Sequence, residues 1–306
     1  MQHVFGPVPS RRLGYSLGVD IIPPKYCSYD CVYCQIGKTT HVEAARRHFY
    51  DPGTIVEQVI EKVSGAAAVD FITFSGSGEP TLNADLGLMI REIKLRTDVP
   101  VAVITNGSLL WLKEVRDDLG EADLVLPSLD AVSQEVFDRI NRPHPTVDIN
   151  AVIEGLKKFR TEFSKQIWLE IMLIKNINDS PEELEKMVEI VQTLNVDKVQ
   201  LNTVTRPPSE SSAERLTDAE LKEICRKFGP SCEIISTFEK APEVRVETAA
   251  ASLILETLKR RPLTLRDVVN ITGMSEFDAK TNLAILEKQG MVTTIVLDDE
   301  LFYVSS

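Results

Sequence analysis

The chain has 306 residues, 43% of them hydrophobic, which is enough apolar material for one large domain and a smaller one. Its formal net charge of −12 argues against broad non-specific binding to nucleic acid or to a membrane surface, because both depend on a basic surface. The sequence has neither an apolar run long enough to span a bilayer nor an N-terminal secretion signal, so we expect a cytoplasmic protein without membrane contact.

Strands alternate with helices over the first two thirds of the chain. Residues 16–22 alternate in the manner of a strand, and Pro23 and Pro24 end the run. Further strands are predicted at residues 71–74, 101–104, 124–126, 167–174 and 198–201, separated by helices at residues 54–63, 85–95, 109–119, 148–159 and one that begins at Pro181. Six strands with helical crossovers predict an α/β protein with a parallel sheet, either doubly wound or an incomplete barrel.

Three of the five cysteines follow the first predicted strand. Cys27, Cys31 and Cys34 have the spacing C-x-x-x-C-x-x-C. An iron–sulfur cluster of four irons normally takes four thiolates, so three thiolates on one loop leave one iron open to a small molecule. The alternatives are a zinc site and a partial disulfide framework. Zinc would need a fourth ligand from a second short-spaced pair, and disulfides are disfavoured in a chain without a secretion signal.

The cysteine motif resembles that of the radical S-adenosylmethionine (radical SAM) superfamily, in which an aromatic residue such as Tyr33 precedes the third cysteine. The resemblance implies a partial (β/α)6 barrel related to the TIM barrel, a [4Fe–4S] cluster on the three cysteines, and SAM bound to the open iron. It also implies reductive cleavage of SAM and hydrogen-atom abstraction from a substrate, with an electron donor such as flavodoxin or ferredoxin. The catalytic residues stay unknown, and the substrate is open between a small molecule, a peptide and RNA.

Glycine and polar residues follow the other predicted strands, where barrel enzymes place their chemistry. The turn after residues 71–74 resembles the glycine–glycine–glutamate element of the family, which holds the SAM amino group; its residues are Gly76, Ser77, Gly78 and Glu79. The alternative for this segment is a tight turn between strand and helix. By position, four more residues resemble those that hold the SAM carboxylate and adenosine: Asn106, Ser128, Asp130 and Asn202. An ordinary Asn-Gly turn at Asn106 and a helix cap at Ser128 are the alternatives.

The opening of the chain and a later segment resemble a radical SAM subgroup related to the wybutosine tRNA-base synthases. This likeness covers roughly residues 5–210 and makes a tRNA base an alternative substrate. The chain departs from those synthases because it has no cysteine before Cys27 for a second cluster. The candidates for binding an anionic substrate group are Arg11, Arg12, Arg142 and His144, with surface ion pairs as the alternative.

Cys225 and Cys232 are too few for an auxiliary cluster of the common kind. The sequence indicates two buried structural thiols, with hydrogen-atom donation to a substrate radical as the alternative. A hypothesis from another functional class is that the chain is a nucleic-acid-binding regulator whose cluster senses redox state. Cleavage of SAM by the reduced protein distinguishes the enzyme from the regulator.

The pattern changes near the C-terminus. Residues 237–248 form a predicted linker between a barrel domain at residues 1–236 and a small domain at residues 249–306. The small domain has predicted helices at residues 253–258 and 265–271, a third capped by Ser275, and a hairpin at residues 291–297 and 301–304, an order that resembles a winged helix-turn-helix domain. Six cations and eight anions between Thr248 and Ser306 give a net charge of −2, so we expect no binding to duplex DNA. Docking of a protein or peptide, or coverage of the open barrel, is the expected role.

Overall fold

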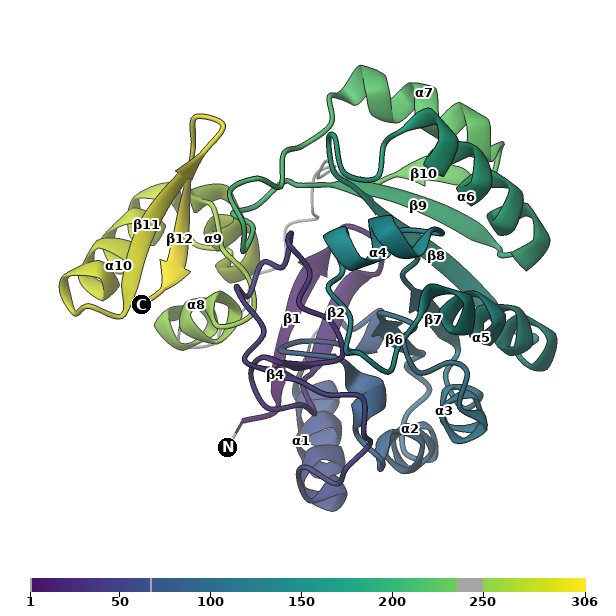
Figure 1. The fold of residues 1–306 in the computed structure, drawn as a ribbon. Helices are drawn as coiled ribbons and strands as arrows, with labels where there is room; N and C mark the ends of the chain where they lie inside the picture. Colours follow the sequence, from purple (N-terminus) through teal and green to yellow (C-terminus); the bar gives the residue numbers. More distant parts are fainter. Residues whose placement is uncertain (1, 67, 236–249) are drawn as a thin grey trace.

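An eight-stranded sheet forms the body of the molecule (Figure 1). The computed structural model describes residues 2–66, 68–235 and 250–306. The six predicted strands are confirmed and pair in parallel in chain order: β2 (Gly14–Val19), β5 (Phe71–Phe74), β6 (Val101–Thr105), β7 (Leu124–Pro127), β8 (Gln166–Leu173) and β9 (Lys198–Thr203). A doubly wound sheet would reverse its strand order partway, and this sheet does not. The fold is therefore a mixed α/β fold with a mostly parallel sheet, consistent with the expected partial barrel.

Both edges of the sheet carry strands that the sequence pattern did not predict. β1 (Val4–Ser10) pairs antiparallel with β2, and β10 (Cys232–Ile234) pairs in parallel with β9. Pro7 and Pro9 lie within β1 and have no backbone N–H to donate, which suits a strand at the edge of a sheet. A separate two-stranded ladder joins β3 (Tyr26–Cys27) to β4 (His41–Val42) beside the cysteine loop.

Helices pack along the outside of the sheet and bury their apolar faces against it (Figure 1). They are α1 (Pro52–Gly65), α2 (Leu86–Lys94), α3 (Lys113–Leu119), α4 (Gln134–Ile140), α5 (Ile149–Glu162), α6 (Pro181–Leu194) and α7 (Asp218–Phe228), with the short 3-10 helix Pro80–Leu82 after β5. Ser180 caps α6 as expected, accepting a hydrogen bond from the backbone of Glu183. The predicted helix at residues 109–119 is shorter in the structure, because Leu109 and Leu110 lie in a turn that fills the core.

The C-terminal residues 250–306 fold as the sequence order predicted. α8 (Ala250–Leu258), α9 (Leu265–Thr272) and α10 (Glu276–Lys288) are followed by the antiparallel hairpin of β11 (Val292–Leu297) and β12 (Glu300–Ser305), at the left of Figure 1. Their apolar core includes Ile254 and Leu283 and extends to Phe5 and Val8 of β1. This segment therefore packs against the edge strand of the sheet. The predicted linker at residues 237–248 lies outside the described residues.

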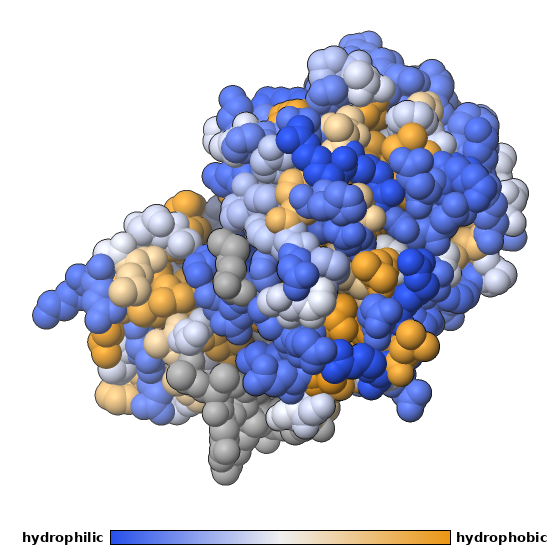
Figure 2. Space-filling model, turned by 90° about the horizontal axis from the view of Figure 1, so that it is seen from below, coloured by the Kyte–Doolittle hydropathy of each residue, from blue (hydrophilic) through white to orange (hydrophobic). Residues whose placement is uncertain are grey.

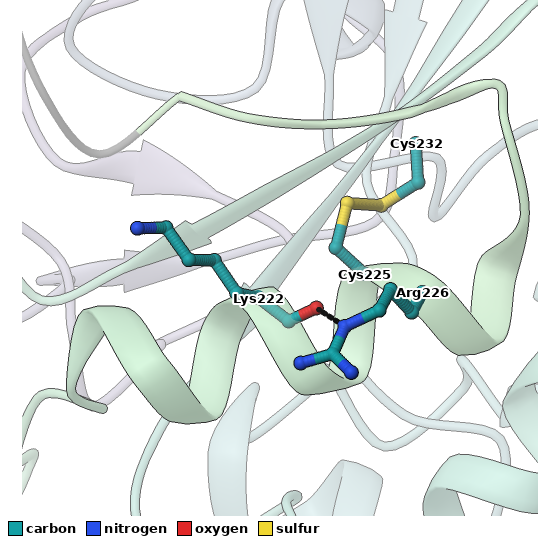
Figure 3. The surroundings of a disulfide bond; sticks show 4 residues. All are labelled: Lys222, Cys225, Arg226 and Cys232. Atoms are coloured by element: carbon teal, nitrogen blue, oxygen red, sulfur yellow. Dashed lines mark hydrogen bonds between the residues drawn. A yellow bond between two sulfur atoms is a disulfide. The ribbon is translucent and has the colours of Figure 1, made fainter.

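Cys225 and Cys232 form a disulfide between α7 and β10, with their Cα atoms 5.6 Å apart (Figure 3). This corrects the expectation of two separate thiols. The two cysteines are seven positions apart in the sequence, and the turn between α7 and β10 brings their sulfur atoms together. The three cysteines of the loop, Cys27, Cys31 and Cys34, are free. Among the described helices, none combines the length and apolar character that crossing a membrane requires.

Candidate functional site

A cavity of about 410 Å³ lies at the carboxyl ends of the parallel strands, a volume typical of small-molecule sites. Residues from the cysteine loop and from the ends of β5, β6 and β7 line it together. Of the predicted site residues, twelve are in its lining: Arg11, Arg12, Cys27, Cys31, Tyr33, Cys34, Gly76, Gly78, Glu79, Asn106, Ser128 and Asn202. Four others, Ser77, Asp130, Arg142 and His144, do not line it.

The cysteine loop is held against the strand ends by side-chain amides. The Nδ2 atom of Asn106 lies 3.5 Å from the Sγ atom of Cys27 and donates to the hydroxyl of Ser28. The Nδ2 atom of Asn141 lies 3.4 Å from the Sγ atom of Cys31. Hydrogen bonds to sulfur ligands are among the means by which proteins orient and tune an iron–sulfur cluster.

The donor set fits a cluster better than a single metal ion. Within the described residues, no three His, Cys, Asp or Glu side chains converge on one point that would hold an ion, as a zinc site requires. A cubane cluster makes a different demand, because each thiolate binds its own iron. Three free thiols in the wall of one cavity meet that demand. Burial raises the pKa of the Cys27 thiol to about 12 and also raises the pKa values of Cys31 and Cys34, so binding of iron has to displace protons from them.

The turn after β5 is built around Gly78 and Glu79. A Cβ atom on Gly78 would lie 1.7 Å from the carbonyl oxygen of Tyr26, so only glycine fits at this contact. The buried carboxylate of Glu79 accepts hydrogen bonds from both Thr81 and Thr105 hydroxyls and from the backbone of Asn106. Burial raises the pKa of Glu79 despite these bonds. Glu79 therefore fastens the turn to the end of β6.

Ser77 and Asp130 do not line the cavity. Ser77 donates its hydroxyl to Asp20 at 2.5 Å. The carboxylate of Asp130 accepts hydrogen bonds from the Tyr33 hydroxyl, the Asn141 amide and the backbone N–H of Met172, at 2.5, 2.8 and 2.9 Å. A buried carboxylate requires such donors, and burial still raises the pKa of Asp130 to about 6. This position differs from the expected contact with SAM: Asp130 holds Tyr33, which lines the cavity beside the cysteines.

Arg142 and His144 lie on the outer surface, which differs from the expected place beside Arg11 and Arg12. Arg142 forms an exposed ion pair with Glu210 at 2.8 Å, and His144 contacts the hydroxyl of Thr146. Their solvated partners match the surface alternative for these two residues.

Arg11 and Arg12 line the cavity. Arg12 donates to the carboxylate of Glu170 at 2.5 Å, and Asn202 donates to the other oxygen of that carboxylate at 2.9 Å. Burial acts to raise the pKa of Glu170, but the nearby Arg12 guanidinium and the Asn202 amide hold it below its ordinary value. Arg11 donates to the carbonyl oxygen of Ile235 at 3.0 Å.

Three further arginines in the cavity lining were not predicted: Arg206, Arg260 and Arg261. Arg206 follows β9, so the rule that selected the other strand-end residues also applied to it. Arg260 and Arg261 follow α8 in the C-terminal segment, and no pattern in the sequence connects that helix to the sheet.

Comparison with known proteins agrees with this geometry. The family model of the radical SAM superfamily matches residues 21–191. A UPF0026 protein of Helicobacter pylori (strain J99) is 33% identical over 281 residues, which are 90% of this chain and 89% of that protein. Among solved structures, a radical SAM methyltransferase from Sphaerobacter thermophilus shares the fold with a TM-score of 0.53 at 18% identity, covering 72% of this chain and 65% of that chain.

Two other relatives carry the names of different activities. A protein of Brachyspira hyodysenteriae named GTPase Obg is 39% identical over 305 residues, which are 99% of this chain and 45% of that protein. The chain thus spans less than half the length of that relative. A probable dual-specificity RNA methyltransferase RlmN of Pseudothermotoga lettingae is 29% identical over 253 residues, which are 78% of this chain and 68% of that protein.

Proposed function

This chain belongs to the radical SAM superfamily and to the UPF0026 proteins within it, and from that premise we propose that Cys27, Cys31 and Cys34 hold its [4Fe–4S] cluster. Enzymes of the superfamily use this cluster and SAM, and they need an electron donor and a substrate; the chain is such an enzyme. The observation that carries the residue assignment is that the three free cysteines line one cavity with Asn106 and Ser128. When bound, the reduced cluster supplies the electron that splits SAM into methionine and a 5′-deoxyadenosyl radical, which abstracts a hydrogen atom from the substrate.

The other residues of the cavity contact SAM or hold the contacting residues in place. Gly76 and Gly78 let the backbone after β5 approach the SAM amino group closely, and Glu79 keeps that turn in place. Asn106 and Asn202 line the cavity and would contact the carboxylate and adenosine of SAM in exchange for their present hydrogen bonds to Ser28 and Glu170. Tyr33, held by Asp130, lines the cavity beside the cysteines. An electron donor such as flavodoxin or ferredoxin completes the system.

The reduced protein should convert SAM to 5′-deoxyadenosine and methionine, and Asn106→Ala should weaken SAM binding about tenfold because an amide donor in the cavity is lost. Its iron content should stay at the wild-type value, since the three thiols remain. Equilibrium binding of SAM and chromatography of the products measure both quantities.

His144→Ala is the matched control, because His144 lies outside the cavity and its loss should leave SAM affinity unchanged. Unaltered SAM affinity in Asn106→Ala would remove Asn106 from the site. A reduced, iron-loaded wild-type protein that leaves SAM intact would favour the redox-sensing regulator over the enzyme.

Modification of an RNA base, including a tRNA base, is the second candidate function. The name of the Pseudothermotoga relative supports it. The net charge of −12 opposes broad contact with RNA phosphates. Nucleoside analysis of total RNA from a deletion strain tests this candidate, since one modified nucleoside should disappear.

For the domain organisation, we propose a partial-barrel domain at residues 1–236 and a winged-helix-like domain at residues 249–306 that covers the open side of the barrel. The packing of α8 and α9 beside β1 and the presence of Arg260 and Arg261 in the cavity wall support coverage. Orange surface is visible at the left of Figure 2, on the side of this segment. The large apolar side chains that the segment exposes are Phe277, Ile285, Met291, Ile295, Val296 and Leu301.

The chain should not bind duplex DNA at physiological salt. The exposed helix α10 begins with Glu276 and Asp278, and the β11–β12 turn carries Asp298 and Asp299, so both elements would face DNA phosphates with negative charge. Fluorescence anisotropy with labelled duplex at two salt concentrations measures this. Tight binding that weakens steeply as salt rises would contradict the prediction.

A further inference from the structure

The cavity carries more positive charge than its own carboxylates balance. Five arginines line it, Arg11, Arg12, Arg206, Arg260 and Arg261, against two carboxylates, Glu79 and Glu170. Glu79 is already engaged by hydroxyl and backbone donors, so it neutralises none of them directly.

Three of these arginines have carboxylate partners. Arg12 pairs with Glu170 at 2.5 Å, and Arg260 pairs with Asp20 at 3.1 Å. Arg206 approaches Asp267 at 3.5 Å and donates its Nε–H to the carbonyl oxygen of Pro262.

The remaining two, Arg11 and Arg261, have no carboxylate within ion-pair distance in the described part of the chain. Arg11 is held by a single backbone carbonyl, that of Ile235. The Nη2 atom of Arg261 is buried and has no hydrogen-bond partner among the described residues. A buried guanidinium nitrogen without an acceptor is costly unless a ligand supplies one.

Arg206 links the two unpaired arginines. Burial is the main cause that lowers the pKa of Arg11 to about 9 and that of Arg261 to about 10, and the positive charge of Arg206 contributes to both shifts. All three line the same cavity, and Arg206 contacts the carbonyl oxygen of Pro262, directly after Arg261, so Arg11, Arg206 and Arg261 form one group of cations, which we call the arginine triad. Its members come from the β1–β2 turn, the segment after β9 and the segment after α8.

We propose that the arginine triad binds the phosphate group of a small phosphorylated substrate in the cavity that also holds the cysteines. The inference rests on the proposed function and specifies its substrate class. Guanidinium groups match phosphate oxygens in geometry, and three of them suit a dianion better than a single carboxylate. The net charge of −12 favours a small phosphate ester over an RNA backbone, because binding along a backbone depends on a broad basic surface.

Titration of inorganic phosphate into the full chain, with and without its cluster, tests the proposal. Wild-type protein should bind phosphate in both states, and Arg261→Gln should weaken that binding at least about tenfold. SAM affinity of the cluster-loaded variant should stay within about twofold of wild type. The melting temperature of Arg261→Gln should rise, because the substitution removes an unpaired cation from a group of cations that repel one another.

Arg142→Gln is the control, since it removes the same charge from an ion pair on the outer surface and should leave phosphate affinity unchanged. Arg261→Lys keeps the positive charge but lacks the planar guanidinium, so it should weaken phosphate binding several-fold. If Arg261→Gln does not fold, the phosphate affinity of Arg261→Lys tests the proposal.

Wild-type phosphate affinity in both Arg261 variants would overturn the proposal. Equal losses of phosphate and SAM affinity would also overturn it, by assigning the triad to the SAM carboxylate. Displacement of phosphate by single-stranded RNA at lower concentration than by glycerol phosphate would overturn it in favour of RNA. Phosphate binding is also measured without the cluster, so a failure of the protein to cleave SAM would not change the outcome of this test.

Discussion

A protein in which Cys27, Cys31 and Cys34 are all changed to alanine should bind close to no iron, under anaerobic conditions in which the wild-type chain binds about four irons. The three thiols are the free cysteines of the chain and share the wall of one cavity. No other group of His, Cys, Asp or Glu in the described residues offers a replacement site. Iron and sulfide analysis after anaerobic reconstitution, with the visible absorption of the cluster, measures the effect.

The double change Cys225→Ala and Cys232→Ala is the matched control for this experiment. It removes the other two cysteines and breaks the disulfide between α7 and β10, which does not line the cavity. Iron binding should stay at the wild-type value in this variant. Full iron retention by the triple variant would end the assignment of the cluster to the cysteine loop.

Gly78→Ala should abolish SAM cleavage and lower the free energy of unfolding by about 3 kcal/mol. The added Cβ atom would lie 1.7 Å from the carbonyl oxygen of Tyr26 and 2.8 Å from a methyl carbon of Ile22. One of these is backbone, so the clash moves the chain at Tyr26, directly before Cys27. Thermal unfolding and product chromatography measure the two effects.

Gly65→Ala provides the comparison for Gly78→Ala. It adds the same methyl group at the end of α1, where no heavy atom lies within 4 Å of the new Cβ. Stability and SAM cleavage should both be unchanged. If Gly78→Ala unfolded at the wild-type temperature with full turnover, the turn after β5 would be free to move and the close approach would have no function.

The sequence predicts the repeating part of the fold because the pattern there is local. Alternation and helix caps such as Ser180 mark each strand and helix within its own segment. Helix α4 was not predicted: its N-cap, Ser133, makes no side-chain capping bond, and the carboxylate of Glu183, in α6, instead accepts hydrogen bonds from the backbone of Val132 and Ser133 just before the helix. β1 was not predicted because prolines usually indicate a loop, although they are compatible with an edge strand.

The candidate site shows the same limit. Residues that follow strands, such as Asn106 and Ser128, reach the cavity because parallel strands end at one side of the sheet. Asp130 lies two positions after Ser128, and only the structure shows that Tyr33 and Asn141 donate hydrogen bonds to its carboxylate. The disulfide was missed because the expectation came from the absence of a secretion signal, whereas the turn between α7 and β10 decides whether the sulfur atoms meet.

The position of α8 beside β1 has a consequence for how the protein is made. Arg261 follows Arg11 by 250 residues, so at cellular rates of synthesis on the order of 10 to 50 seconds pass between them. Each strand of the main sheet from β5 to β9 pairs with the strand of that sheet made before it, so the sheet can assemble during this interval. The cysteine loop is then present while the wall that carries Arg260 and Arg261 is still missing. Iron delivery to the nascent chain would meet a wider opening than delivery to the finished protein.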